Sequence, residues 1–142
     1  MHESTPEQGQ DLKRALLIAE AAIDKGGLEP VLLDLTEQRT YTDYLMLVSA
    51  RSERQVRAIM DHVLERMQEV GLRAVGVEGR REGRWGLIDL GDVVLHIFQQ
   101  ELRAHYNLES LWVDAPRVPL PTAKAQTVPG DSDEDLGYSL AD

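Results

Sequence analysis

The stretch at residues 85–98, with the sequence WGLIDLGDVVLHIF, places an aromatic ring, two carboxylates and a histidine on what we predict to be two adjacent strands. Because side chains alternate along a strand, Trp85, Leu87 and Asp89 should share one face. An Asp on that face is costly to bury unless it is paired, so we expect the face to be partly open. A large aromatic beside carboxylates is typical of a protein-binding surface. A tryptophan of the core or its rim accounts for Trp85 about equally well.

A histidine in the second strand raises the question of catalysis. His96 lies between Leu95 and Ile97, and Asp89 is placed to pair with it across the hairpin. An Asp–His pair without a serine or cysteine nucleophile is weak evidence for an enzyme, and the chain has no cysteine. Ser52 is better explained as a helix N-cap. We therefore expect His96 to be structural and predict no catalytic residue.

Two further patterns suggest ion binding. Asp89 and Asp92 are three residues apart, which is compatible with magnesium, but support of a turn and contact with a partner are the favoured interpretations. Arg80, Arg81 and Arg84 form a small basic cluster in the preceding turn, where a solvated loop is favoured and an RNA contact is the alternative. No glycine-rich phosphate motif with a Walker lysine occurs. We predict neither a metal nor a cofactor.

These residues must be positioned by a sheet. Along the whole chain, helical and strand patterns follow one another in the order α-β-β-α-β-β-β-α. The second helix begins with a capping box at Ser52 and Gln55 and ends at Gly71. We predict an α/β fold: a single mixed β-sheet of about five strands with two main helices packed on it. The predicted elements are helices at 10–25, 52–70 and 101–111, and strands at 31–35, 44–48, 73–78, 85–90 and 92–98.

Both ends of the chain differ in composition from the middle. Residues 1–9 are polar and read as a flexible N-terminus, and residues 10–117 form the predicted domain. Prolines and an acidic run follow, so we expect residues 118–142 to be a disordered acidic tail.

Bulk composition limits the class of protein. The chain has 142 residues, a formal net charge of −10 and no cysteine. Neither a signal peptide nor an apolar run long enough to cross a bilayer is found, so we expect a soluble, cytoplasmic protein without membrane contact. Acidic proteins attract basic proteins and repel nucleic acid, which favours a protein partner and little or no direct nucleic-acid binding.

Six stretches in order together resemble the ribosomal silencing factor family, also called the Iojap-related family. The resemblance covers roughly residues 12–117, and Ala50 departs from it, since the family commonly has glycine there. The matching stretches are residues 33–35 (LDL), 41–44 (YTDY), 52–59 (SERQVRAI), 77–79 (VEG), 85–98 and 106–116 (YNLESLWVDAP).

The resemblance implies a nucleotidyltransferase-like sheet without enzymatic activity. Family members bind large-subunit ribosomal protein fourteen, block joining of the small subunit, repress translation and take part in large-subunit maturation. Carried onto this chain, the partner-binding surface comprises Trp85 as apolar anchor, Leu87 and His96, with Glu78 and Asp89 pairing with basic residues of the partner.

Other interpretations stay open at this point. The main alternative is a nucleotide-binding, nucleotidyltransferase-like protein, although the Gly-Ser followed by Asp-x-Asp of that class does not occur. A homodimer formed through an exposed apolar sheet face is also possible.

Overall fold

The apolar run at residues 44–48 lies in the centre of the sheet. It forms strand β2, Tyr44–Ala50, in which every residue is buried. Strand β5, Val93–Gln99, runs parallel to β2 and is buried in all but its last residue. A strand covered on both faces leaves no side to water, which explains why the sequence does not alternate here.

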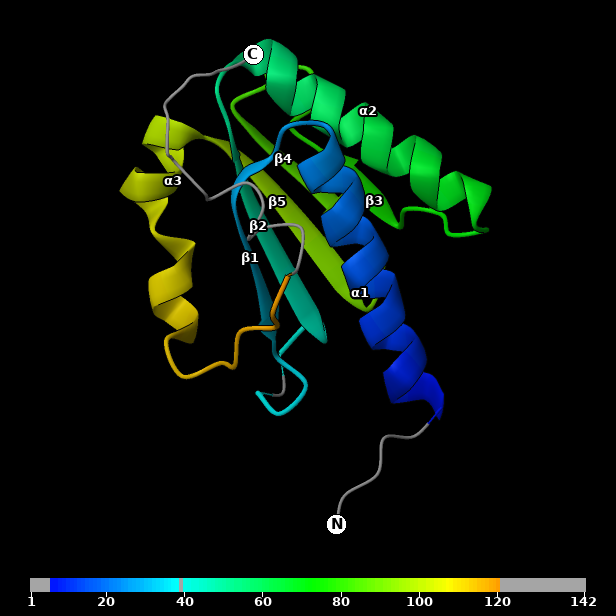
Figure 1. Cartoon of the computed structure of the whole chain (residues 1–142). Coiled ribbons are helices and arrows are strands. Elements are labelled where there is room, and N and C mark those ends of the chain that lie inside the picture. The colour runs from blue at the N-terminus through cyan, green and yellow to red at the C-terminus, as the bar shows by residue number, and fades with distance from the viewer. Residues whose placement is uncertain (1–5, 39, 121–142) are drawn as a thin grey trace.

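The computed structural model describes residues 6–38 and 40–120, and in this part of the chain the five strands form one mixed sheet in the order β1-β2-β5-β4-β3. Only β2 and β5 are parallel among its neighbouring pairs (Figure 1). The predicted order of elements and the antiparallel hairpin of β4 and β5 are confirmed. The other elements are α1 (Pro6–Asp24), β1 (Leu28–Asp34), α2 (Glu53–Glu69), β3 (Gly76–Glu78), β4 (Trp85–Asp89), α3 (Gln100–Tyr106) and the 3-10 helix η1 (Leu108–Trp112).

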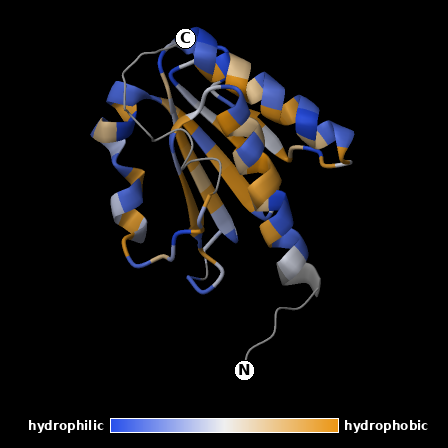
Figure 2. Ribbon diagram, in the orientation of Figure 1, coloured by the Kyte–Doolittle hydropathy of each residue, from blue (hydrophilic) through white to orange (hydrophobic). Residues whose placement is uncertain are grey.

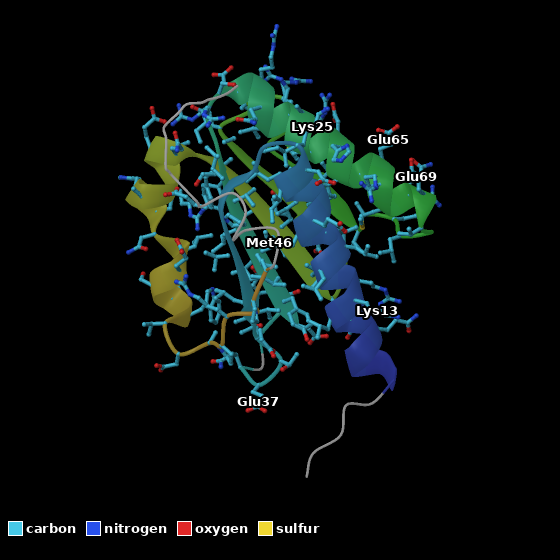
Figure 3. The ribbon with its side chains drawn as sticks, viewed as in Figure 1. Lys13, Lys25, Glu37, Met46, Glu65 and Glu69 are labelled. Atoms are coloured by element: carbon cyan, nitrogen blue, oxygen red, sulfur yellow. The ribbon has the colours of Figure 1, made fainter. Side chains whose placement is uncertain are left out.

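Helices α1 and α2 cover one face of the sheet, as predicted (Figure 1). Met46, in the middle of β2, points into the core beneath them, whereas Glu65 and Glu69 lie on the outer side of α2 (Figure 3). Figure 2 shows apolar residues concentrated in the strands and hydrophilic residues along the outside of α2. The α2 side chains in this core are Val56, Ile59, Met60, Val63 and Met67.

The opposite face carries α3 and η1, two short segments into which the helix predicted at 101–111 is divided at Asn107, where φ is 48°. Leu102, Leu108 and Trp112 pack there against a second buried cluster that includes Phe98. Tyr106, the last residue of α3, is 47% exposed. Because these segments are short, they cannot cover the whole face.

The N-terminus of α2 is capped much as predicted. The Ser52 hydroxyl accepts a hydrogen bond from the Gln55 amide at 3.1 Å. The return bond differs by one residue, because the Gln55 Oε1 accepts from the Arg51 amide rather than from that of Ser52. The cap still satisfies backbone donors at the start of the helix.

Element ends differ from the predictions by a few residues. Helix α1 begins at Pro6, and β1 begins at Leu28 rather than Val31. A register shift after Leu28, with Glu29 at a φ of 49°, lets β1 continue through a polar stretch that concealed it in the sequence. Strand β3 has three residues instead of the predicted six.

The chain after η1 returns along the free edge of β1. The Asp34 amide donates to the Pro116 carbonyl, and the Val118 amide donates to the Leu32 carbonyl, both at 2.8 Å. Leu120 packs against the core below α1 and α2. Residues 6–9 of the predicted flexible N-terminus 1–9 are helical, and residues 118–120 of the predicted tail 118–142 pack on the domain. The rest of these two predicted ends, residues 1–5 and 121–142, lies outside the described residues. No helix in the described ranges is long and apolar enough to cross a membrane.

Candidate protein-binding site

Three strands bring the five predicted site residues onto one face of the sheet. Glu78 of β3 lies opposite Leu87 of β4, which in turn lies opposite His96 of β5. Opposed residues of antiparallel strands point to the same face, so these side chains form a row. Trp85 and Asp89 flank Leu87 at two-residue spacing on that face. The predicted shared face of Trp85, Leu87 and Asp89 is confirmed.

This face of β4 is partly open. Gly86 and Ile88, which point toward α2, are buried, whereas Trp85, Leu87 and Asp89 are each only partly buried. Helix α3 packs chiefly over β5 and β2, leaving β4 and β3 less covered. The open face that the position of Asp89 predicted is confirmed.

Trp85 belongs to an aromatic cluster that fixes its orientation. Its Nε1 donates a hydrogen bond to His96 Nδ1 at 2.9 Å. Its ring centroid lies 4.8 Å from that of Phe98 and 4.7 Å from that of Tyr106. Aromatic pairs at such distances stabilise one another beyond the area that they bury. The cluster joins α3 to β4 and β5 and presents Trp85 and Tyr106 at its outer side.

His96 is a neutral structural residue. The indole N–H of Trp85 can only donate, so His96 Nδ1 must accept and the proton sits on Nε2. Burial lowers the pKa of His96 to about 4. Its Nε2 is buried and has no hydrogen-bond partner in the described part of the chain. A ring held in this state is not poised for acid–base catalysis near neutral pH.

The predicted pairing of Asp89 with His96 is wrong. Asp89 lies opposite Val94, and its Oδ1 accepts from the Gly91 amide at 2.9 Å. The short side chain satisfies the turn next to it instead of reaching along the strand to the imidazole. Asp89 thus has the turn-supporting role that we had expected of Asp92.

Asp92 instead holds the sheet to α1. Arg14 Nη1 lies 2.9 Å from Asp92 Oδ2 and 3.2 Å from Asp11 Oδ1. Burial raises the pKa of Asp11 to about 7, and hydrogen bonds to Asp92 and Asp43 act in the same direction. Within residues 6–38 and 40–120, no group of three or more His, Asp or Glu side chains is arranged to hold a metal.

Sequence reasoning missed a buried arginine between α3 and β1. Arg103 is 9% exposed, and its Nη1 donates to the Glu29 carbonyl at 2.6 Å and to Ser49 Oγ at 3.0 Å. Its Nε and Nη2 donate to the Glu109 carboxylate. A pocket of about 390 Å³ opens beside these groups. The guanidinium of Arg103 already donates its hydrogen bonds to acceptors of the protein. We therefore interpret the pocket as a gap where α3 meets β1 and not as an anion-binding site.

The arginines of the β3–β4 turn lie against the first turns of α2. Arg80 forms a two-bond pair with Asp61, at 2.7 Å for each bond, which lowers the pKa of that carboxyl. Arg57 Nη1 donates to the Arg81 carbonyl at 3.0 Å. Arg84 is exposed. The turn is therefore part of a basic region shared with α2, which its short sequence did not reveal.

Comparison with known proteins identifies the family. Residues 7–138 match the family model described as "Ribosomal silencing factor during starvation". The chain is 42% identical over 105 residues to the ribosomal silencing factor RsfS of Bacillus subtilis, covering 73% of this chain and 89% of that protein. It is 29% identical over 83 residues to the mouse protein named mitochondrial assembly of ribosomal large subunit protein 1, covering 36% of that protein.

Solved structures agree with the sequence comparisons. A crystal structure from Chromobacterium violaceum superposes with a TM-score of 0.70 at 30% identity, covering 78% of this chain and 91% of the other. One from Bacillus halodurans gives a TM-score of 0.67 at 39% identity, covering 78% and 99%. The chain belongs to the RsfS family of ribosomal silencing factors, which are translation regulators and not enzymes.

Proposed function

We propose that this chain docks on the large ribosomal subunit through ribosomal protein fourteen and so blocks joining of the small subunit. The docking surface is the open sheet face, made of Trp85, Leu87, Asp89, Glu78 and His96. The observation that carries the proposal is the partly open β4 face in a member of this family. The nucleotidyltransferase likeness of the sheet stays a prediction.

The chemistry of the face suits a basic protein. Trp85 and Leu87 supply partly exposed apolar area, and Tyr106 extends it across α3. Glu78 is exposed at the outer edge, and Asp89 is partly exposed beside Leu87. Anchoring aromatics within a rim of carboxylates are typical of surfaces that bind lysine- and arginine-rich proteins. His96 contributes indirectly, by holding the indole in place.

A role in assembly of the large subunit is part of the proposal. The mouse relative is named for assembly of the mitochondrial large subunit. A protein that covers the subunit-joining face would also keep immature large subunits out of translation. We propose that this occurs in the cytoplasm, where bacterial subunits meet.

The test is co-sedimentation with purified large subunits, followed by a subunit-joining assay. Glu78→Arg reverses an exposed charge without touching the core, so it should fold normally and weaken binding. Trp85→Ala removes the anchor and should cost about 2 kcal/mol or more, or roughly thirtyfold in affinity. Both variants should relieve the block on joining in proportion to their loss of binding.

Glu65→Arg is the matched control, since Glu65 is equally exposed but lies on the outer side of α2 (Figure 3). It should bind large subunits as the wild type does. Equal weakening by Glu65→Arg and Glu78→Arg would mean that net charge, not this face, governs binding. Unchanged binding of folded Trp85→Ala would remove the anchor from the proposal. A monomer–dimer measurement on the same samples tests self-association through this face.

A further inference from the structure

A basic patch lies at one end of this acidic molecule, next to the end of the open sheet face at which β4 begins. It is built by the first turns of α2, the β3–β4 turn and the end of α1. Gln55 Nε2 donates to the Lys25 carbonyl, and Arg57 donates to that of Arg81, so these three segments are in direct contact. Lys25 lies near the start of α2 in Figure 3. The residues that we group as the basic patch are Lys25, Arg51, Arg54, Arg57, Arg81 and Arg84.

The cations of the basic patch are not neutralised by the fold. None of the six has a carboxylate oxygen within 4.0 Å among the described residues, whereas five other described arginines form ion pairs. Three carboxylates lie in the same segments, at Asp24, Glu53 and Glu82, and Asp24 is paired with Arg66 outside the patch, so the six cations leave a positive excess. Unpaired like charges held this close favour binding of an anionic group.

The chain itself carries a matching anion. Four carboxylates fall within residues 131–135, at Asp131, Asp133, Glu134 and Asp135. With the overall charge of −10, a free polyanion such as RNA would be repelled at a distance. A covalently attached acidic segment does not face that barrier, because its effective concentration at the patch is set by the linker.

The direction of the last described segment brings the acidic run within reach. Arg117 lies opposite Leu33 in an antiparallel bridge, so the chain leaves toward the end at which β1 begins. Leu28, at that end, lies opposite Ser49, and Arg51 follows β2 directly. Strand spacings place Leu120 roughly 15 Å from Arg51. An unstructured linker of eleven residues, the number that separates 120 from 131, would span about 18 Å, which is enough to cover that gap.

We propose that the acidic segment at residues 131–135 docks on the basic patch of the same chain. The contact is electrostatic, so it weakens as ionic strength rises. It keeps the arginines from binding nucleic acid nonspecifically. The inference concerns contacts within one chain and does not depend on the proposed ribosomal partner.

A spin label tests the contact in the full chain. The protein has no cysteine, so Ser132→Cys provides a single site for the label. At low salt, the backbone amide signals of Arg51, Arg54 and Arg81 should lose most of their intensity through paramagnetic relaxation. High salt should restore them. Label-induced broadening that is absent at low salt, or that is strongest on a surface far from the patch such as that around Lys13 of α1, would overturn the proposal.

Charge variants of the labelled protein provide the matched comparison. Arg54→Glu with Arg81→Glu should abolish the broadening at the remaining patch amides. Arg73→Glu changes an exposed arginine that also lacks an ion pair but lies outside the patch, and it should leave the broadening unchanged. Equal loss of broadening in the double variant and in Arg73→Glu would show that the position of the label depends on net charge and not on the patch. That result would contradict the proposal.

Affinity for a short single-stranded RNA gives a second readout. Neutralising the four carboxylates of 131–135 should tighten RNA binding several-fold more than neutralising four exposed glutamates elsewhere, because only the first change uncovers the patch. Both variants change the net charge equally. If they bind RNA alike, the tail does not occupy the patch and the proposal fails. The control set is Glu20, Glu37, Glu65 and Glu69, each changed to Gln.

Discussion

The hydrogen bond between Trp85 and His96 determines what each residue can do. The sequence placed His96 on the correct face, and a structural role was the expected one. It did not identify the partner, because Asp89 and Trp85 both lie two residues from Leu87, which faces His96. Alternation along a strand defines a face but not which diagonal neighbour a rotamer will reach. The side chain of Trp85 is long enough to reach the imidazole, while Asp89 is held by its own turn.

Because the imidazole of His96 is neutral in the folded protein, the free energy of unfolding should decrease at acidic pH. The pKa of His96 falls from 6.5 to about 4 on folding because the ring is buried. Its contribution is complete above about pH 6.5 and is lost as the pH falls toward 4, by on the order of 3 kcal/mol for a shift of this size. His96→Asn keeps an acceptor near the position of Nδ1 but cannot titrate. Denaturant unfolding should therefore show a smaller acid-induced loss in His96→Asn than in the wild type, and an identical loss would contradict the assignment.

At the scale of elements, the sequence predicted types and order better than ends. The capped helix α2 and the buried strand β2 each carry a pattern that excludes the alternatives. The predicted start of β1 was three residues too late. The register shifts between Leu28 and Val31, where the sequence is polar, and pairing with β2 continues the strand across this irregularity. The position of α3 rests on Arg103, a buried arginine that looks like any solvated one in the sequence. Contacts between distant segments leave no local pattern.

The β3–β4 turn offers a test of backbone geometry. Gly79 and Gly71 both have a positive φ, near 80°, so each should resist substitution by Ala. A Cβ on Gly79 would also clash with the Trp85 carbonyl oxygen, whereas one on Gly71 meets nothing within 4 Å. We expect Gly71→Ala to cost about 1 kcal/mol and Gly79→Ala clearly more, because the backbone itself must move. Thermal unfolding of the two variants checks this, and equal costs would show that the turn adapts freely.

At the scale of the whole molecule, the titrations of Asp11 and His96 have opposite effects on stability. The pKa of Asp11 rises from 3.8 to about 7 on folding, chiefly by burial. A carboxyl that binds its proton more tightly when folded stabilises the fold below about pH 4, and that contribution is lost as the pH rises through 7. His96 acts in the opposite direction over much of the same range. The two effects should partly cancel and flatten the pH profile of the wild type.

The variant Asp11→Asn tests the contribution of Asp11 to this pH dependence. The amide resembles the protonated carboxyl and cannot ionise next to Asp92 and Arg14. At about pH 8 the variant should gain roughly 1 kcal/mol over the wild type, an amount that allows for screening by solvent. Below about pH 4 the gain should vanish, because Asp11 is then protonated in both the folded and the unfolded state. Asp24→Asn, at the exposed end of α1, is the control and should show no such pH-dependent gain. A gain that is constant with pH would point to helix propensity instead.

The two outer strands of the sheet bear on how the protein stays dispersed in a crowded cell. An uncovered strand edge offers unpaired backbone groups to other chains and promotes aggregation. Here one edge is occupied by the returning segment through Val118, and the other is the short strand β3 with the charge of Glu78 at its end. Edge-to-edge stacking is therefore disfavoured on both sides. The protein can keep an apolar sheet face accessible without the usual risk of polymerising.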